Sequence, residues 1–141
     1  MNTVFTQVNW TLGTLMSDIE VGNIGLPDIQ RPFVWSNKQV RELFDSMYRG
    51  YPIGYLLFWK TLATHNSKTI GTDEKQRAPN LTIVDGQQRL TSLYAVIKNI
   101  PVVRKGFETE RIQVAFNPLE ERFEVADASI LRDKSFLSDI S

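Results

Sequence analysis

The sequence predicts an α/β fold, with a small mixed sheet flanked by about three helices. Three stretches place apolar residues at i, i+3, i+4 and i+7, the spacing of one helix face. These stretches are residues 12–19, 40–48 and 90–97. Short apolar runs, typical of strands, lie between them at residues 24–26, 55–59 and 81–84. Together the two patterns favour the α/β class.

The first two helices carry start and stop signals of their own. Thr11 is a suitable N-cap for the first helix, and Gly22 is a suitable stop. Ser36 opens the second helix, with Gln39 three residues on to complete a capping box. Gly50 is the expected C-terminal stop. Local chemistry therefore supports both helices independently of their periodicity.

Two further segments have strand patterns. Tyr55–Trp59 is a continuous apolar run, which predicts a strand buried on both sides. Residues 111–116 and 122–125 alternate in polarity around a longer turn, residues 117–121, and so predict a hairpin. Residues 127–141 have only weak periodicity.

At 141 residues the chain is long enough for one domain with its own core, so residues 1–141 are expected to form a single domain. Residues 61–80 are polar and contain Gly71 and Pro79, which predicts a flexible loop or an insertion. No closing element precedes Ser141. We therefore expect the chain to be an N-terminal piece of a longer protein.

The composition excludes several classes of site. The chain has no cysteine, which removes disulfides, thiolate metal sites and cysteine nucleophiles. The single histidine, His65, cannot build a histidine metal cluster. The 16 basic and 16 acidic side chains balance, so contact with DNA needs a local patch or another domain. A signal peptide and a membrane-spanning apolar run are both absent, which predicts a cytoplasmic protein.

The polar cluster DGQQR, Asp85–Arg89, lies where the third predicted strand ends and the third helix begins. The first amides of a helix are unpaired and lie at the positive end of its dipole. Gly86 lets a ligand approach the backbone closely, and Arg89 offers a bidentate fork for an anion. The cluster therefore predicts an anion site, most naturally a phosphate site.

The same cluster also fits a purely structural interpretation. Asp85 is a suitable N-cap, and Gln88, three residues on, would complete a capping box. Capping alone leaves Gln87 and Arg89 without a role, because neither is needed to start a helix. The spacing by itself leaves both interpretations open.

A second candidate lies in PDIQRPFVW, residues 27–35. Arg31, preceded by Gln30, lies between two prolines and close to Phe33 and Trp35, so its conformational freedom is restricted. It is either a second phosphate ligand or an arginine stacked on Trp35. The residues alone favour stacking.

The two motifs together resemble a known family. The similarity lies in PDIQRPFVWSNKQVRELFDSMYRGYPIGYLLFW followed by IVDGQQRLTSLYAVI, and it runs from about Thr11 to Asn99. These segments are similar to the N-terminal domain of GmrSD-type restriction enzymes and to the matching domain of SspE-type phage-defence proteins. The resemblance implies a ParB/sulfiredoxin-like fold. It also implies an NTP-binding hydrolase that gates DNA cleavage in defence against modified or foreign DNA.

The resemblance also implies a site that takes an NTP of unknown base together with Mg²⁺. The implied cofactor-binding residues are Gln30, Arg31, Gly86 and Arg89, the implied catalytic residues are Asp85, Gln87 and Gln88, and Asp85 is the implied metal ligand. The two arginines would neutralise phosphate oxygens, with amides of Gly86 and Gln87 as further donors. Asp85 would hold Mg²⁺ or orient the attacking water. One of the two glutamines would position that water.

The implied partners are a nucleotide and DNA, the latter through an additional C-terminal nuclease domain or a partner protein. We expect no autonomous nuclease activity, because the only compact acidic cluster beside a lysine is Asp73–Lys75, which fits a solvated loop. Assembly into a homo-oligomer is left open. The alternatives are a DNA-binding or nicking ParB-like module and a non-catalytic scaffold of the same fold.

Overall fold

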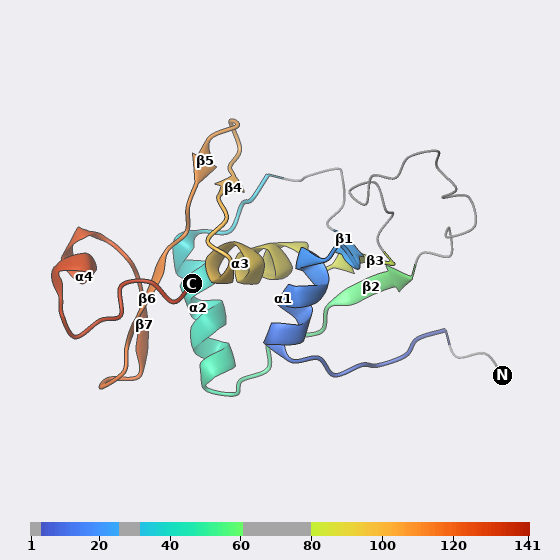
Figure 1. Cartoon of the computed structure of the whole chain (residues 1–141), viewed down its shortest axis with the longest axis horizontal. Helices are drawn as coiled ribbons and strands as arrows, with labels where there is room; N and C mark the ends of the chain where they lie inside the picture. The colour runs from blue at the N-terminus through green and yellow to red at the C-terminus, as the bar shows by residue number, and fades with distance from the viewer. Residues whose placement is uncertain (1–3, 26–31, 61–79) are drawn as a thin grey trace. The chain divides into compact units, whose positions relative to one another are not determined.

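The computed structural model describes residues 4–25, 32–60 and 80–141 (Figure 1). These divide into two compact units. The first unit comprises Met1–Pro27 and Phe58–Ile83, and the second comprises Asp28–Leu57 and Val84–Ser141. Several residues of predicted function lie outside the described residues, so their roles stay predictions: Gln30, Arg31, His65 and Asp73–Lys75.

The first unit begins with α1, Leu12–Glu20, as the periodicity predicts. Thr11 caps it, because its side chain accepts a hydrogen bond from the backbone N–H of Thr14 at 3.1 Å. Leu15 and Met16 lie on the buried face of the helix. The helix leads into β1, Ile24–Gly25, at the position predicted for the first strand.

The strands β1, β3 (Leu81–Asp85) and β2 (Leu57–Lys60) form a three-stranded sheet with β3 in the centre. β1 and β3 are parallel, with Ile24 opposite Leu81. The buried side chains of Ile24 and Ile83 are the apolar contribution of these two strands to the core. The sheet matters for function because β3 ends at Asp85, the first residue of the DGQQR cluster.

The prediction that Tyr55–Trp59 is buried on both sides is wrong. Tyr55 is 78% exposed and Trp59 is 69% exposed, whereas Leu56 and Phe58 between them are half-buried. Among the described strands β2 is an edge strand, so its side chains alternate between an inner and an outer face. A continuous apolar run does not distinguish this arrangement from a strand covered on both sides.

In the second unit, α2 spans Asn37–Tyr48 and begins with the predicted capping box. The Ser36 hydroxyl accepts from the N–H of Gln39 at 3.2 Å, and the Gln39 side chain accepts from the N–H of Ser36 at 2.9 Å. On the apolar face predicted for residues 40–48, the side chains of Val40, Leu43 and Phe44 are buried. Gly50 follows the helix with a φ of +75°, in the left-handed region that favours glycine.

Helix α3, Gln87–Ile97, is the central helix of the second unit (Figure 1). Leu90 and Leu93 are buried as predicted, and Ala95 and Val96 widen the buried surface beyond one face. Ser92 is also fully buried, and its hydroxyl donates to the carbonyl oxygen of Gln88 at 2.7 Å. Helix α2 packs against α3 on one side and against the C-terminal hairpin on another.

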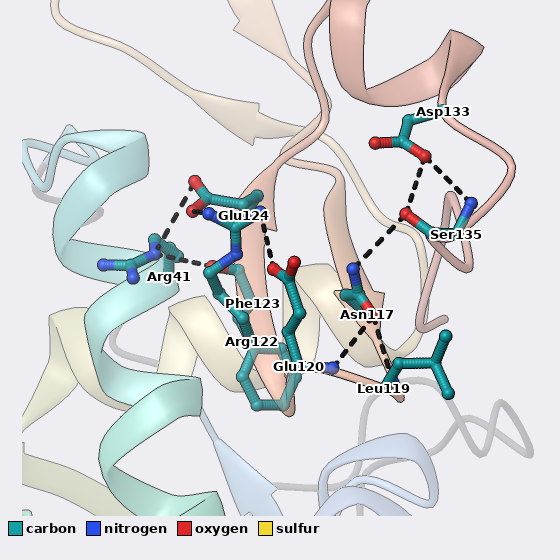
Figure 2. Close-up of polar contacts among 9 residues, drawn as sticks. All are labelled: Arg41, Asn117, Leu119, Glu120, Arg122, Phe123, Glu124, Asp133 and Ser135. Carbon is teal, nitrogen blue, oxygen red and sulfur yellow. Dashed lines mark hydrogen bonds and ion pairs between the residues drawn. The ribbon is translucent and has the colours of Figure 1, made fainter.

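That hairpin consists of β6 (Val114–Asn117) and β7 (Arg122–Val125), antiparallel as predicted. Figure 2 shows how the buried Asn117 closes its turn. The amide oxygen of Asn117 accepts from the N–H groups of Leu119 at 3.0 Å and Glu120 at 3.1 Å. On the neighbouring face, Arg41 of α2 donates to the carbonyl oxygen of Phe123 at 2.7 Å (Figure 2), which ties the hairpin to α2.

Three short elements carry no clear sequence pattern and were not predicted. They are β4 (Val102–Val103), its antiparallel partner β5 (Thr109–Glu110) and α4 (Ala128–Arg132). Elements of two to five residues are too short to display a period of 2 or 3.6. The four helices and the small sheets of residues 4–25, 32–60 and 80–141 together confirm the α/β class.

Candidate functional site

The N-terminus of α3 has no side-chain cap. Gly86 is the N-cap residue, with a φ of +92° in the left-handed region, and it makes no side-chain cap hydrogen bond. The capping box proposed for Asp85 and Gln88 is therefore not formed. The backbone N–H groups of Gln87, Gln88 and Arg89 lie at the positive end of the helix dipole, and no described carboxylate or hydroxyl group caps them in the usual way.

Glycine is required at position 86 for two reasons. Its positive φ is strained for other residues. A Cβ atom would also lie 2.5 Å from Cδ2 of Leu56 and 3.1 Å from Nη2 of Arg89. The turn between β3 and α3 is thus packed directly against the segment that precedes β2.

Arg89 is bonded to that same segment. Its Nη1 donates to the carbonyl oxygen of Ile53 at 2.6 Å, and its Nη2 donates to the carbonyl oxygen of Tyr55 at 3.0 Å. Gly54, between these two carbonyls, has a φ of +87°. In this structure Arg89 therefore fastens the first turn of α3 to residues 53–55.

Gln88 bonds the first turn of α3 to a second segment of the chain. Its amide oxygen accepts from the backbone N–H of Val34 at 2.9 Å. Val34 belongs to PDIQRPFVW, the second motif that the sequence singles out, whose described residues begin at Pro32. The DGQQR cluster thus holds the end of the second motif through Gln88.

Arg104 fixes the same segment, and the sequence analysis missed it. Its Nη1 donates to the carbonyl oxygens of Phe33, at 3.3 Å, and Trp35. Its Nε forms an ion pair with Glu110 at 2.7 Å, and its Nη2 donates to Asn37 at 2.8 Å. The guanidinium also lies 4.8 Å from the centroid of the Phe33 ring. In the sequence Arg104 is one residue of a basic connection, and no local pattern marks it.

Glu110 completes this polar cluster from β5. One of its carboxylate oxygens accepts from Asn37 at 2.9 Å and the other from Arg104 at 2.7 Å. These two hydrogen bonds, from Asn37 and from Arg104, lower the pKa of Glu110 below its ordinary value. The β4–β5 hairpin thereby holds the chain on both sides of Val34 in place.

Asp85 and Gln87 differ from Gln88 and Arg89. Asp85 is exposed and Gln87 is half-exposed, and neither side chain forms a hydrogen bond or ion pair within the described part of the chain. Residues 4–25, 32–60 and 80–141 contain no group of three or more histidine, aspartate or glutamate side chains that could hold a metal ion. Asp85 could therefore supply one carboxylate to Mg²⁺, with phosphate oxygens and water as the other ligands, an arrangement that Mg²⁺ commonly adopts.

Comparison with known proteins identifies the family of this chain. The family model described as GmrSD restriction endonuclease, N-terminal domain, matches residues 12–141. The chain belongs to this family. This membership confirms the predicted resemblance. The chain is therefore a GmrSD N-terminal domain, a type found in restriction and phage-defence proteins.

An uncharacterized protein of Methanocaldococcus jannaschii is 33% identical to this GmrSD N-terminal domain over 85 residues. The aligned region covers 54% of the chain and only 15% of that relative's length. No solved structure matches the chain significantly. Among the described residues, no helix has both the length and the apolar character needed to cross a membrane.

Proposed function

We propose that this GmrSD N-terminal domain binds the phosphate chain of an NTP, with Mg²⁺, at the N-terminus of α3. The observation that supports the proposal most directly is the first turn of α3, with Gly86 as its N-cap and no side-chain cap hydrogen bond. Three consecutive backbone N–H groups at the positive end of an 11-residue helix favour an anion. A phosphate chain would supply the acceptors that a capping side chain supplies elsewhere.

Asp85 and Gln87, which have no side-chain partner among the described residues, are the candidates for chemistry. The Asp85 carboxylate would hold Mg²⁺ or orient the water that attacks the γ-phosphorus. Gln87 would hold that water by hydrogen bonds from its amide. Mg²⁺, when bound, would neutralise charge on the phosphate oxygens. Asp85 and Gln87 therefore carry the proposed hydrolysis.

Gln88 and Arg89 are assigned to positioning in this proposal. Each is bonded to backbone of a different segment, Gln88 to Val34 and Arg89 to Ile53 and Tyr55. These bonds hold the loops on both sides of the helix start at fixed places. A phosphate site needs such support, because donors that must reorganise contribute less to binding.

NTP hydrolysis by this domain would regulate DNA cleavage, and the domain would not cleave DNA itself. The chain has 16 basic and 16 acidic side chains, which leaves no general attraction for the phosphates of DNA. Contact with DNA and its cleavage are accordingly assigned to a further nuclease domain or to a partner protein.

A non-catalytic scaffold is the second candidate. The internal bonds of Gln88 and Arg89 favour it, because half of the polar residues in the DGQQR cluster are used in packing. On this alternative the motif joins three segments of the second unit and binds no nucleotide.

Thermal unfolding with tripolyphosphate or NTP, with and without Mg²⁺, separates the two candidates. Ligand binding to the folded state alone stabilises it by about 2.7 kcal/mol at a hundred times Kd. Gln87→Ala should leave binding nearly intact and abolish hydrolysis, measured as phosphate release. Gln7→Ala removes an exposed glutamine far from the motif in sequence and is the control. A melting temperature that does not respond to any of these ligands would favour the scaffold.

A further inference from the structure

A shallow groove of about 250 Å³ opens on the second unit beside α3. Helix α2 and the turn before β2 form its walls, and Arg89 of α3 lies along it. Arg89 belongs both to the groove and to the first turn of α3. A ligand seated in the groove would therefore lie next to the proposed phosphate site.

Apolar and aromatic side chains line part of the groove. Leu43 is buried, and Ile53 and Trp35, which also line the groove, are half-buried. The backbone around Trp35 is fixed, because Arg104 binds its carbonyl oxygen and Gln88 binds the N–H of Val34. A flat aromatic ligand suits such a surface, since a nucleobase can stack on an indole whose backbone is already fixed.

The rim of the groove presents a donor and an acceptor on one face of α2. The amide oxygen of Gln39 is occupied by the N–H of Ser36 at 2.9 Å, which leaves the amide nitrogen as a donor. Glu42, one turn further along, contributes two carboxylate oxygens. Its ion pair to Lys38, at 4.0 Å, is solvent-exposed and weak. The carboxylate also repels phosphate, so a phosphate chain would lie on the Arg89 side of the groove.

We infer that this groove is the nucleoside subsite of the proposed NTP site and that it selects guanine. Guanine is the only base with two adjacent donors, N1–H and the exocyclic amine, which match the two oxygens of Glu42. Its O6 acceptor then faces the Gln39 amide. Adenine and cytosine offer one donor beside an unprotonated nitrogen, and uracil places a carbonyl oxygen against the carboxylate. The inference rests on the proposed function, since it locates the base relative to the phosphates.

Calorimetric titration of the full chain with Mg²⁺ and five ligands tests the inference: tripolyphosphate, GTP, ATP, CTP and UTP. Tripolyphosphate reports on the phosphate site alone. GTP should bind about tenfold more tightly than ATP and than tripolyphosphate, the effect expected of charge-assisted hydrogen bonds. Glu42→Gln should reduce the preference for GTP over ATP to about twofold or less. Glu108→Gln removes the same charge from an exposed site outside the groove and should keep the tenfold preference.

Two results would overturn the nucleoside subsite and leave the proposed function standing. One is equal affinity for tripolyphosphate and all four nucleotides. The other is a preference for GTP that Glu42→Gln does not change. Failure of tripolyphosphate and of every nucleotide to bind contradicts the proposed function itself, and with it the subsite. Circular dichroism of Glu42→Gln checks that the fold is retained, which the exposure of Glu42 leads us to expect.

Discussion

Gly54 lies so close to Arg89 that a Cβ atom on the glycine would come 2.7 Å from Nη1 of the arginine. The same guanidinium donates to the carbonyl oxygens on both sides of Gly54, those of Ile53 and Tyr55. The turn before β2 and the start of α3 are therefore packed directly against each other.

Gly54→Ala should destabilise the protein. Its φ of +87° costs a non-glycine residue about 1–2 kcal/mol, and the new methyl group displaces the guanidinium. With the loss of a hydrogen bond, we expect a decrease of about 1–3 kcal/mol in the free energy of unfolding. Urea denaturation measures it. Gly13→Ala, in α1 with no atom within 4 Å of the added carbon, is the control and should stabilise by about 0.5–1 kcal/mol.

Arg89→Ala should lower the free energy of unfolding by about 1–3 kcal/mol, because two backbone carbonyls lose a charged donor. Arg89→Lys should recover only part of this loss, since an ammonium group does not reproduce the fork that reaches both oxygens. Chemical denaturation and calorimetric titration with tripolyphosphate are measured on the same samples. Unchanged stability together with lost binding would identify Arg89 as a direct phosphate ligand and contradict the positioning role.

Asp85→Ala should leave the stability of the folded domain nearly unchanged. Asp85 makes no capping hydrogen bond, so the loss of about 0.5–2 kcal/mol that follows removal of an N-cap does not apply. Ser36→Ala removes a true cap from α2 and should show that loss. Of these two variants, only Asp85→Ala should weaken the Mg²⁺-dependent binding of NTP. A loss of stability similar to that of Ser36→Ala would make Asp85 a structural residue.

Glu110 should make the stability of the second unit depend on acid pH. Its pKa is lowered in the folded state by hydrogen bonds from Asn37 and Arg104, so its stabilising effect is present above the ordinary glutamate value of 4.5 and is lost as the pH falls through the folded pKa. The difference in unfolding free energy between the wild type and Glu110→Gln should therefore shrink below pH 4.5.

Local patterns in the sequence determined the main helices and the position of the DGQQR cluster. Thr11 and the Ser36–Gln39 box act within one turn of the helices they start, so spacing alone predicts them. The cluster at the junction of β3 and α3 was predicted in the same way, from an apolar run followed by helical periodicity.

Tertiary structure alone decided what the residues of that cluster bind. The partners of Arg89 and Gln88 are 36 and 54 positions away in the sequence, and Arg104 reaches Trp35 across 69 positions. A periodic pattern carries no information on such distant contacts, because it reports only which side of an element is apolar. The exposure of β2 was decided in the same way, by its place at the edge of the sheet. The sequence determined where the candidate site lies, and the packing of distant segments determined which of its side chains are left to bind a ligand.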